Sequence, residues 1–599
     1  MAANAVRQQC GGAIVKAGSR FLYFKSSDPV SSSRRAHGPR GFILGLSGFP
    51  VPKATPLFPL AAEVRRRRTF AIISHPDAGK TTLTEKLLLF SGAIQIAGSV
   101  KARKASRHAT SDWMEIEKQR GISVASSVMQ MSYRDHVINL LDTPGHKDFS
   151  EDTYRVLTAV DAALMVIDAA NGVEDQTRRL IEVCRQRDTP ILTFVNKMDR
   201  EVRDPLDLLD EVERELGMPC VPMTWPVGQG KTFGGIINLR SRAMTVFEAG
   251  SARRPEDFET IALTEQDTLI ARFGHTFETA RDSMELAVGA SPAWDHAAFL
   301  AAKQTPVFFG SGVNNFGVME VLDALVDLAP PPQPRISTVM ASGQAGQQTV
   351  QPDDPAFSGV VFKVQANMDP AHRDRIAFVR VASGRYAPGM KLKVQRTAKE
   401  LRPTSVVTFL SQRREAVDEA YAGDIIGFTT HGGVQLGDTI TDGSVALQYT
   451  GLPFFAPELF MTVVLANPLR TKQLQQGLAQ LGEEGAIQVF RPDAGGNMLL
   501  GAVGQLQFEV VQHRLKTEYD CAVRLEGCPY TGARWISAAT PDLLRQFEAA
   551  YPMRMARDAA GALAYLCTSP YDVRLAQERF PDVQFHPLRE HAGLALQNH

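Results

Sequence analysis

One nine-residue stretch constrains the fold of this 599-residue chain more than any other. Residues 74–82 read Ser-His-Pro-Asp-Ala-Gly-Lys-Thr-Thr, and they lie between the apolar run 70–73 and the helix-like run 83–89. In a phosphate loop, successive backbone N–H groups surround an anion at the positive N-terminus of a helix, while a lysine reaches the outer phosphates and a hydroxyl binds Mg²⁺. The stretch therefore predicts a strand, a phosphate-binding loop and a helix, in that order.

All nine residues of the stretch are candidate nucleotide-binding residues. They are Ser74, His75, Pro76, Asp77, Ala78, Gly79, Lys80, Thr81 and Thr82. Lys80 takes the role of the phosphate-binding lysine and Thr81 that of the Mg²⁺-binding hydroxyl. The strict pattern has glycine at the first position, where this chain has Ser74, so the match needs support from the rest of the sequence.

That support comes from strongly apolar runs that follow in the same region. Residues 137–142, 162–168 and 191–196 have the composition of buried strands, a helical pattern covers 173–187, and another strand-like run covers 306–310. Continuous apolar strands alternating with amphipathic helices are typical of a parallel sheet covered on both faces, with ligands at the carboxyl ends of the strands. We expect an α/β domain over 65–335, with an irregular insertion at about 225–302.

Three further motifs stand at the ends of these strands. Asp142-Thr143-Pro144-Gly145 could hold Mg²⁺ through water with its carboxylate and bind a γ-phosphate with the Gly145 N–H. The carboxylate of Asp199 in Asn196-Lys197-Met198-Asp199 suits the two N–H donors of guanine, which adenine lacks. Backbone N–H groups of Gly310-Ser311-Gly312 could contact the base oxygen. Together with the phosphate loop, these motifs predict a domain that binds GTP with Mg²⁺.

The rest of the chain predicts two more domains. A proline-rich stretch at 330–334 ends the first domain, and a linker over 336–356 follows. Short β-type runs without helices over 357–452 predict a β-barrel, and mixed strands and helices over 453–599 predict an α+β domain with a split βαβ unit. Six cysteines without a CxxC pair are expected to be buried apolar residues, with no structural zinc.

The first 64 residues fit none of these patterns. They contain only two acidic residues, Asp28 and Glu63, with scattered Gly and Pro and no periodicity. A disordered extension, a start codon assigned too far upstream and an organelle transit peptide are the alternatives, and the prolines weaken the last. The arginines at 65–68 could contact RNA or form a solvated face.

Charge and hydropathy exclude only two classes of protein, a uniformly basic nucleic-acid-binding protein and one with a membrane-spanning run. Lys and Arg together number 65, as do Asp and Glu, which argues against a uniformly basic nucleic-acid coat. No run approaches the ~18 apolar residues that a membrane span needs.

The ordered set of motifs resembles the translational GTPases. The phosphate loop, Ser-Asp-Trp-Met-Glu (111–115), Glu-Lys-Gln-Arg-Gly-Ile-Ser (117–123) and Asp-Thr-Pro-Gly-His resemble the bacterial peptide chain release factor 3 family, and the likeness runs from about Arg66 to the C-terminus. The resemblance implies a cytoplasmic GTPase that binds the ribosome after peptide release and promotes departure of the codon-reading class I release factors. We expect GTP or GDP with Mg²⁺ as ligands, no membrane association, and a monomer.

The resemblance also assigns two site residues. It implies that His146, directly after the γ-phosphate-sensing glycine, is catalytic and orients the attacking water on the ribosome. Ser123 falls where most of these GTPases carry a threonine that binds Mg²⁺ and γ-phosphate, and a serine keeps the hydroxyl. The predicted Mg²⁺ ligands are therefore Thr81, Ser123 and Asp142.

Two other functions stay open at this point. An elongation factor G-like translocase or rescue GTPase would need roughly two further domains of ~100–150 residues each, for which the chain is too short. A GTP-dependent binding switch with little hydrolysis is opposed, but not excluded, by the histidine after Asp-Thr-Pro-Gly.

Overall fold

The computed structural model describes residues 59–94, 123–247, 258–341, 344–366, 375–403, 405–410, 413–430, 433–450 and 452–590. Residues 1–58 of the predicted extension lie outside these residues. So does the polar stretch 98–119, whose lack of an apolar stripe predicts a mobile loop. The three domains below belong to one compact unit, which spans residues 57–599.

The first domain is built on a mostly parallel sheet, as the apolar runs predict. Its strands pair in the order β2-β3-β1-β4-β5-β11-β6, and all neighbouring pairs are parallel except β2 with β3. The strands are β1 (Arg67–Ser74), β2 (Ser127–Tyr133), β3 (His136–Asp142), β4 (Ala162–Asp168), β5 (Ile191–Asn196), β6 (Cys220–Pro222) and β11 (Thr305–Phe309). Because β1 lies between β3 and β4, the phosphate loop leaves from the middle of the sheet.

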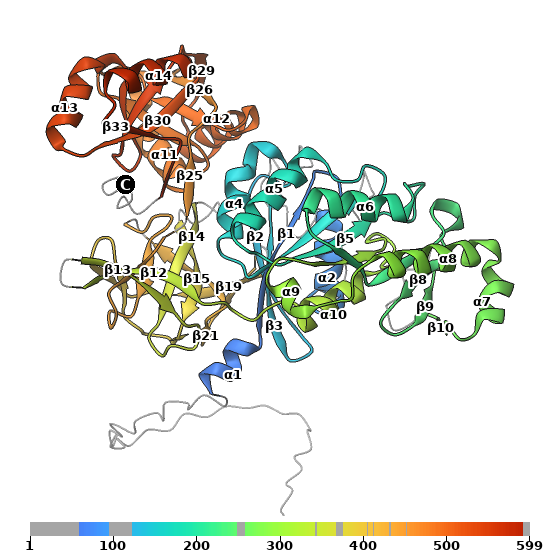
Figure 1. Ribbon diagram of the computed structural model, residues 1–599. Helices are drawn as coiled ribbons and strands as arrows, with labels where there is room; N and C mark the ends of the chain where they lie inside the picture. The colour runs from blue at the N-terminus through green and yellow to red at the C-terminus, as the bar shows by residue number, and fades with distance from the viewer. Residues whose placement is uncertain are drawn as a thin grey trace, which may run out of the picture. The chain divides into compact units, whose positions relative to one another are not determined.

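Helices cover both faces of this sheet (Figure 1). They are α2 (Lys80–Phe90), α4 (Ser150–Leu157), α5 (Asp175–Gln186), α6 (Pro205–Leu216) and α10 (Val318–Asp327). Alternate residues of β1 point to opposite faces: Phe70 and Ile72 pack with α2 and α10, whereas Ala71 and Ile73 pack with α4, α5 and α6. The two-sided core explains why the strands read as continuous apolar runs.

The insertion has its own small antiparallel sheet. Strands β7 (Thr224–Val227), β8 (Gly235–Asn238), β9 (Ala243–Val246) and β10 (Thr260–Ala262) pair in sequence order, and α7 (Gln266–Phe273), α8 (His275–Ala290) and α9 (His296–Leu300) follow. Trp225 is fully buried and meets Phe309 of β11 edge-on, with ring centroids 5.3 Å apart. The insertion is therefore packed against the sheet that carries the site.

The second domain is all-β, and it begins earlier than predicted. Its strands are β12 (Arg335–Ala341), β13 (Gln344–Val350), β14 (Ser358–Ala366), β15 (Arg375–Ser383), β16 (Arg385–Tyr386), β17 (Leu392–Val394), β18 (Lys399–Leu401), β19 (Val406–Leu410), β20 (Arg413–Ala416), β21 (Ala420–Tyr421), β22 (Ile425–Thr430), β23 (Thr439–Thr441) and β24 (Leu447–Tyr449). The predicted linker over 336–356 is wrong over β12 and β13, which form an antiparallel hairpin that pairs with β24. Val350 and Tyr449 share a small core that holds this hairpin to the domain.

The third domain repeats one topology twice. Each half runs strand-helix-strand-strand-helix-strand, the split βαβ arrangement predicted for the first half only. The first half is β26 (Leu459–Leu465), α11 (Thr471–Glu483), β27 (Gln488–Pro492), β28 (Leu499–Ala502), α12 (Gln505–Tyr519) and β29 (Val523–Gly527), and the second is β30 (Gly532–Ala538), α13 (Pro541–Ala550), β31 (Met555–Asp558), β32 (Leu563–Cys567), α14 (Pro570–Arg579) and β33 (Val583–His586). Pairing of β27 with β31 joins the halves into one eight-stranded sheet.

Two short elements complete the chain. Strand β25 (Pro453–Phe455) pairs with β34 (Leu588–Glu590), and helix α1 (Leu60–Arg65) precedes β1. The predicted extension over 1–64 is therefore wrong at its end, because residues 60–64 are helical and Glu63 and Val64 are buried.

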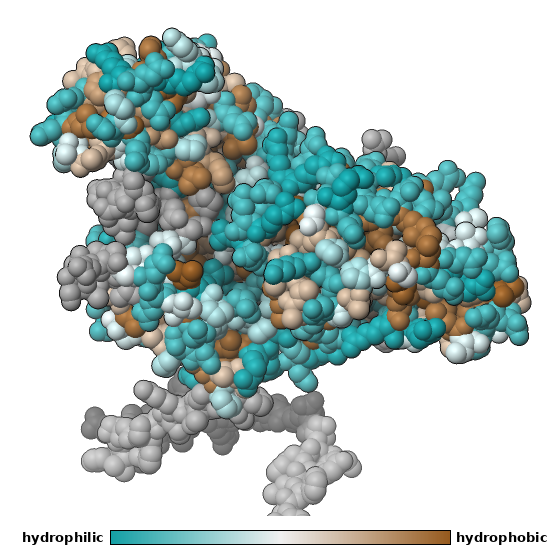
Figure 2. All heavy atoms as spheres, viewed as in Figure 1, coloured by the Kyte–Doolittle hydropathy of each residue, from teal (hydrophilic) through white to brown (hydrophobic). Residues whose placement is uncertain are grey.

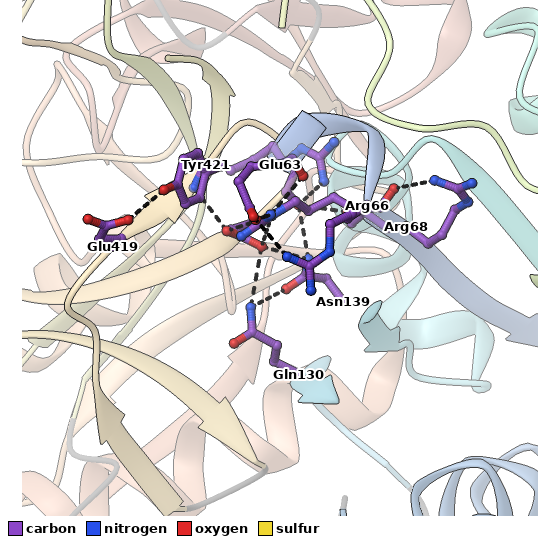
Figure 3. Close-up of polar contacts among 12 residues, drawn as sticks. Glu63, Arg66, Arg68, Gln130, Asn139, Glu419 and Tyr421 are labelled. Atoms are coloured by element: carbon purple, nitrogen blue, oxygen red, sulfur yellow. Dashed lines mark hydrogen bonds and ion pairs between the residues drawn. The ribbon is translucent and has the colours of Figure 1, made fainter. Parts of the chain in front are cut away.

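A buried charge network joins the first domain to the all-β domain (Figure 3). Arg67 forms ion pairs with Glu63 of α1 and with Asp424, which lies 3.2 Å from its Nε atom. Gln130 and Asn139 also donate to the Asp424 carboxylate, over 3.4 and 3.3 Å. Burial alone would lower the pKa of Arg67, but the attraction of Asp424 and Glu63 raises it. Neither interpretation of the arginine run holds for Arg67, which is a structural residue between domains.

A second ion pair lies in the same interface. Arg380 of β15 pairs with Asp161, and both side chains are almost completely buried. The Gly423 carbonyl accepts hydrogen bonds from Thr69, over 2.6 Å, and from Arg380. Gly423 has φ = +104°, and a methyl group there would press on Arg67, so this turn requires glycine.

The surface and the cysteines agree with a globular protein. The face in Figure 2 is mainly hydrophilic, with hydrophobic residues in small scattered groups. None of the helices in the described ranges is long and apolar enough to cross a bilayer. As expected, Cys184, Cys220, Cys521 and Cys567 are buried, and burial raises the pKa of Cys184 to about 12. Cys528 is only half-buried, which differs from the expectation. Cys10 lies outside the described residues.

Candidate functional site

The phosphate loop has the backbone shape that its sequence predicts. It leaves β1 at Ser74, and α2 begins at Lys80 with Thr81 and Thr82 in its first turn. Asp77 and Gly79 have φ of +64° and +95°, and a methyl group at Gly79 would overlap the amide of Asn196. The buried Ser74 hydroxyl donates to the His75 carbonyl over 2.8 Å, so a serine fits where the strict pattern has glycine.

His75 is held by a residue that sequence reasoning missed. Its Nε2 atom lies 2.8 Å from a carboxylate oxygen of Glu174, the N-cap residue of α5. This contact ties the loop to the helix after β4, so His75 helps to shape the loop.

The strand next to β1 brings Asp142 to the start of α2. The Asp142 carboxylate forms a buried ion pair with the Lys80 ammonium group. Thr143 donates to the Ile72 carbonyl of β1 over 2.7 Å, and a methyl group added at Gly145 would come within 3.4 Å of the Pro76 backbone. The segment Asp142–Gly145 therefore lies directly against the phosphate loop.

Asn196 connects three predicted loops. Its amide nitrogen donates to the Ala78 carbonyl over 2.8 Å, and its amide oxygen accepts from the N–H groups of Gly312 and Lys197, each over 2.9 Å. The side chain is only 3% exposed. One buried amide thus fixes the phosphate loop relative to both candidate base-binding loops.

The two candidate base-binding loops also contact each other. The Ser311 hydroxyl donates to the Asp199 carboxylate over 2.6 Å, and the Met198 N–H donates to the Gly310 carbonyl over 3.1 Å. Asp199 is therefore held at the carboxyl ends of β5 and β11, beside Gly310–Gly312. This position suits a carboxylate that reads guanine.

Lys197 has a partner that no prediction assigned. Its ammonium group lies 2.6 Å from the carboxylate of Asp168 and also donates to the Asp77 carbonyl. Asp168 ends β4, and an acidic residue at the end of a buried strand was the signal that could have identified it.

The remaining predicted residues lie on the segments around β2 and β3. Ser123 lies four residues before β2, whose first residue, Ser127, pairs with Asp142 across the sheet. The imidazole of His146 is partly exposed, and its Nδ1 atom accepts the Asp148 N–H over 3.2 Å. Pro144 accepts a hydrogen bond from Thr153 of α4 over 3.2 Å.

The donor set fits a magnesium ion bound together with nucleotide phosphates. Mg²⁺ prefers oxygen ligands and is usually held by one or two protein groups plus phosphates and water. Thr81, Ser123 and Asp142 offer two hydroxyls and one carboxylate, and the Asp142 carboxylate already lies against a cation, the Lys80 ammonium group. Within the described ranges, no cluster of three or more His, Cys, Asp or Glu side chains could hold a metal by itself.

Comparisons with known proteins assign each domain. Residues 65–331 match the model described as "Elongation factor Tu GTP binding domain", residues 356–443 match "Elongation factor G domain 2", and residues 449–577 match "Class II release factor RF3, C-terminal domain". These matches confirm the predicted order of an α/β GTP-binding domain, a β-barrel-type domain and an α+β domain. The C-terminal match argues against an elongation factor G-like translocase.

Close relatives cover nearly the whole chain. Peptide chain release factor 3 of Bordetella petrii is 66% identical over 541 residues, which are 90% of this chain and 99% of that protein. The protein of the same name from Nitrosomonas europaea is 65% identical over 536 residues, 89% of this chain and 98% of that one. A crystal structure of a Thermus thermophilus protein is 25% identical, with a TM-score of 0.62 over 79% of this chain and 69% of that chain.

The GTP-binding motifs, the order of the three domains and the extent of these identities lead to one conclusion: the chain belongs to the peptide chain release factor 3 family of translational GTPases, the GTP hydrolases of translation termination.

Proposed function

We propose that this protein promotes the dissociation of codon-reading class I release factors from the ribosome after peptide release, with GTP hydrolysis stimulated by the ribosome. It would act in the cytoplasm as a monomer. The observation that carries the proposal is the convergence of four predicted loops at one edge of the sheet, with Asn196 bonded to three of them. The match of the C-terminal domain to the class II release factor family supports a role in translation termination.

GTP binding is assigned to the loops at the strand ends. Backbone N–H groups from Ser74 to Thr82 would surround the phosphates, and Lys80 would exchange the Asp142 carboxylate for phosphate oxygens. Asp199 would accept the two N–H donors of guanine, beside the Gly310–Gly312 backbone. The Gly145 N–H would contact the γ-phosphate, since Gly145 packs against the phosphate loop.

Magnesium would enter with the nucleotide. Thr81, Ser123 and Asp142 are the residues that would hold it, the last through water. Bound there, the ion would neutralise charge on the β- and γ-phosphates.

His146 is assigned the catalytic role. It directly follows Gly145, and its ring would orient the attacking water and stabilise the transition state when the protein is docked on the ribosome. It would leave ground-state phosphate binding to the loop, Lys80 and Thr81.

The test measures GTP turnover with and without ribosomes. His146→Ala should lower ribosome-stimulated turnover by roughly 10²-fold, the scale of a positioned catalytic group, and leave GTP and GDP affinity intact. Lys80→Ala should instead weaken nucleotide binding. His136→Ala is a matched control, because His136 begins the strand that ends at Asp142 and so lies at its opposite end.

Two results would count against the proposal. Wild-type stimulated turnover in His146→Ala would refute the catalytic role and favour a GTP-dependent binding switch. Normal ribosome-stimulated hydrolysis without any acceleration of class I release factor dissociation would refute the proposed step.

A further inference from the structure

The turn that follows His146 is held by the C-terminal domain. The Asp148 carboxylate accepts the backbone N–H of Leu506, in the first turn of α12, over 2.8 Å. The Asp148 side chain is only 7% exposed. A residue two positions after the proposed catalytic histidine is thus bonded to a helix from another domain.

Helix α12 lacks a side-chain cap of its own at this position. Its N-cap residue is Gly504, which has no side chain, so the N–H of Leu506 obtains its acceptor from Asp148. Gly504 also lets the two segments approach, since a methyl group there would overlap the Asp148 carboxylate. Its φ of −146° is accessible to any residue, so the need for glycine here is spatial.

Asp148 contacts His146 as well as α12. The Asp148 N–H donates to Nδ1 of His146 over 3.2 Å, and a carboxylate oxygen lies 3.5 Å from the same Nδ1 atom. The imidazole is therefore folded back over its own turn. Asp148 therefore contacts both the imidazole and the first turn of α12.

The helix that continues from this turn is attached to the same domain. Arg155 of α4 donates to the Gly485 carbonyl over 3.2 Å, and Glu151 accepts from Gln488 over 2.9 Å. Phe149 packs with Val510 of α12 in a small apolar cluster. These contacts hold one side of the segment 148–155 against the turn after α11, against β27 and against α12.

We infer that Asp148 is a positioning residue through which the C-terminal domain holds His146 in a retracted position. While α12 keeps the Asp148 carboxylate, the imidazole stays on its own turn. When the first turn of α12 separates from Asp148, the turn is released and His146 gains access to the water at the γ-phosphate. The inference rests on the proposed catalytic role of His146.

Gly504→Ala tests this inference without altering Asp148 or Leu506, the two residues that form the contact. The added methyl should displace the Asp148 carboxylate, raise ribosome-free GTP turnover on the order of tenfold, as for a typical coupling between sites, and leave GTP affinity unchanged. Gly527→Ala is the matched control, because Gly527 lies in the same domain and a methyl there has no atom within 4 Å. The control should behave like the wild type.

A double-mutant cycle separates this mechanism from general loosening. In a His146→Ala background, Gly504→Ala should have no effect on turnover, because the gain acts through the histidine. An equal gain in that background would overturn the inference, as would unchanged or lower turnover in Gly504→Ala alone.

Hydrogen exchange provides an independent readout. Gly504→Ala should increase exchange of the Leu506 amide and of residues 146–149 in the full-length protein, and Gly527→Ala should not. Unchanged exchange at 146–149 despite loss of protection at Leu506 would overturn the coupling. If His146→Ala keeps wild-type stimulated turnover, the proposed function fails, and the exchange experiment still decides whether α12 holds the turn.

Discussion

Replacing Asn196 should weaken nucleotide binding by disconnecting loops, without removing any atom proposed to touch the phosphates. Asn196→Ala eliminates three hydrogen bonds, and two of them join different loops, namely the one to the Ala78 carbonyl and the one from the Gly312 N–H. The third, from the Lys197 N–H, lies within the loop of Asn196 itself. Asn196 is only 3% exposed, so water cannot easily take over the hydrogen bonds that its side chain now makes. At about 1 kcal/mol for each of the two hydrogen bonds between loops, the binding free energy falls by about 2 kcal/mol, which is roughly a 30-fold increase in Kd.

The effect should be the same for GTP and GDP, because the loops that Asn196 joins would contact the base and the phosphates common to both. Asn196→Asp should be at least as damaging, since it places an oxygen opposite the Ala78 carbonyl where the amide now donates. Competition binding with a fluorescent GDP analogue measures both variants. Asn238→Ala is a matched control, because Asn238 accepts backbone N–H groups in a turn of the insertion.

Two outcomes would refute this reasoning. Wild-type affinity in Asn196→Ala would mean that the loops keep their positions without the amide. A loss for GTP alone would mean that Asn196 acts at the γ-phosphate and not on the arrangement of the loops.

Three further predictions concern the base, the N-terminal boundary and acid stability. Asp199→Asn should shift preference from GTP toward XTP, because an amide suits the 2-oxo group of xanthine; unchanged preference in a competition assay would remove the base-reading role. A chain starting at residue 59 should melt like the full chain, whereas one starting at residue 64 should melt at a lower temperature, because it lacks Glu63 beside Arg67; equal melting would show that this pair is dispensable. Hydrogen bonds, first the one from Arg554, lower the pKa of Asp572 in the folded protein. The ionised carboxylate therefore stabilises the folded state at pH values above the unfolded pKa of about 3.9, and this stabilisation is lost as the pH falls through the lower folded value. Asp572→Asn should thus lower the melting temperature at pH 7 and reduce its fall in acid, as scanning calorimetry would measure; a parallel acid profile would contradict the assignment.

The candidate nucleotide site was predictable because its residues lie on loops that directly follow the strands of the sheet. The phosphate loop joins β1 directly to α2, and a parallel sheet brings the ends of β3, β5 and β11 to the same edge. Strand composition and short motifs therefore predict both the fold of this domain and the position of its candidate site.

Elements that depend on distant partners were not predictable in the same way. Strand β13 has the sequence Gln-Ala-Gly-Gln-Gln-Thr-Val, which lacks an apolar face, and among the described strands it pairs with β12 alone. Within the run 65–68, nothing in the local pattern distinguishes Arg67, whose partner Asp424 is 357 positions away. The second split βαβ unit of the C-terminal domain was missed because its short strands, such as β31 and β33, have only four residues each.

The contact between Asp148 and α12 shows why interactions between residues far apart in the sequence are hard to predict from the sequence. A helix start is usually predicted from a Ser, Thr, Asp or Asn at its own N-cap, and α12 has Gly504 there instead. The missing acceptor comes from a residue 358 positions earlier, beside the proposed catalytic histidine. A capping interaction contributes about 1 kcal/mol, and a carboxylate at the positive end of the helix adds up to about 1 kcal/mol. An interaction of about 1–2 kcal/mol biases the position of the turn by about 5- to 30-fold, yet it is weak enough for the binding energy of a large partner to break, as a contact that regulates His146 would require.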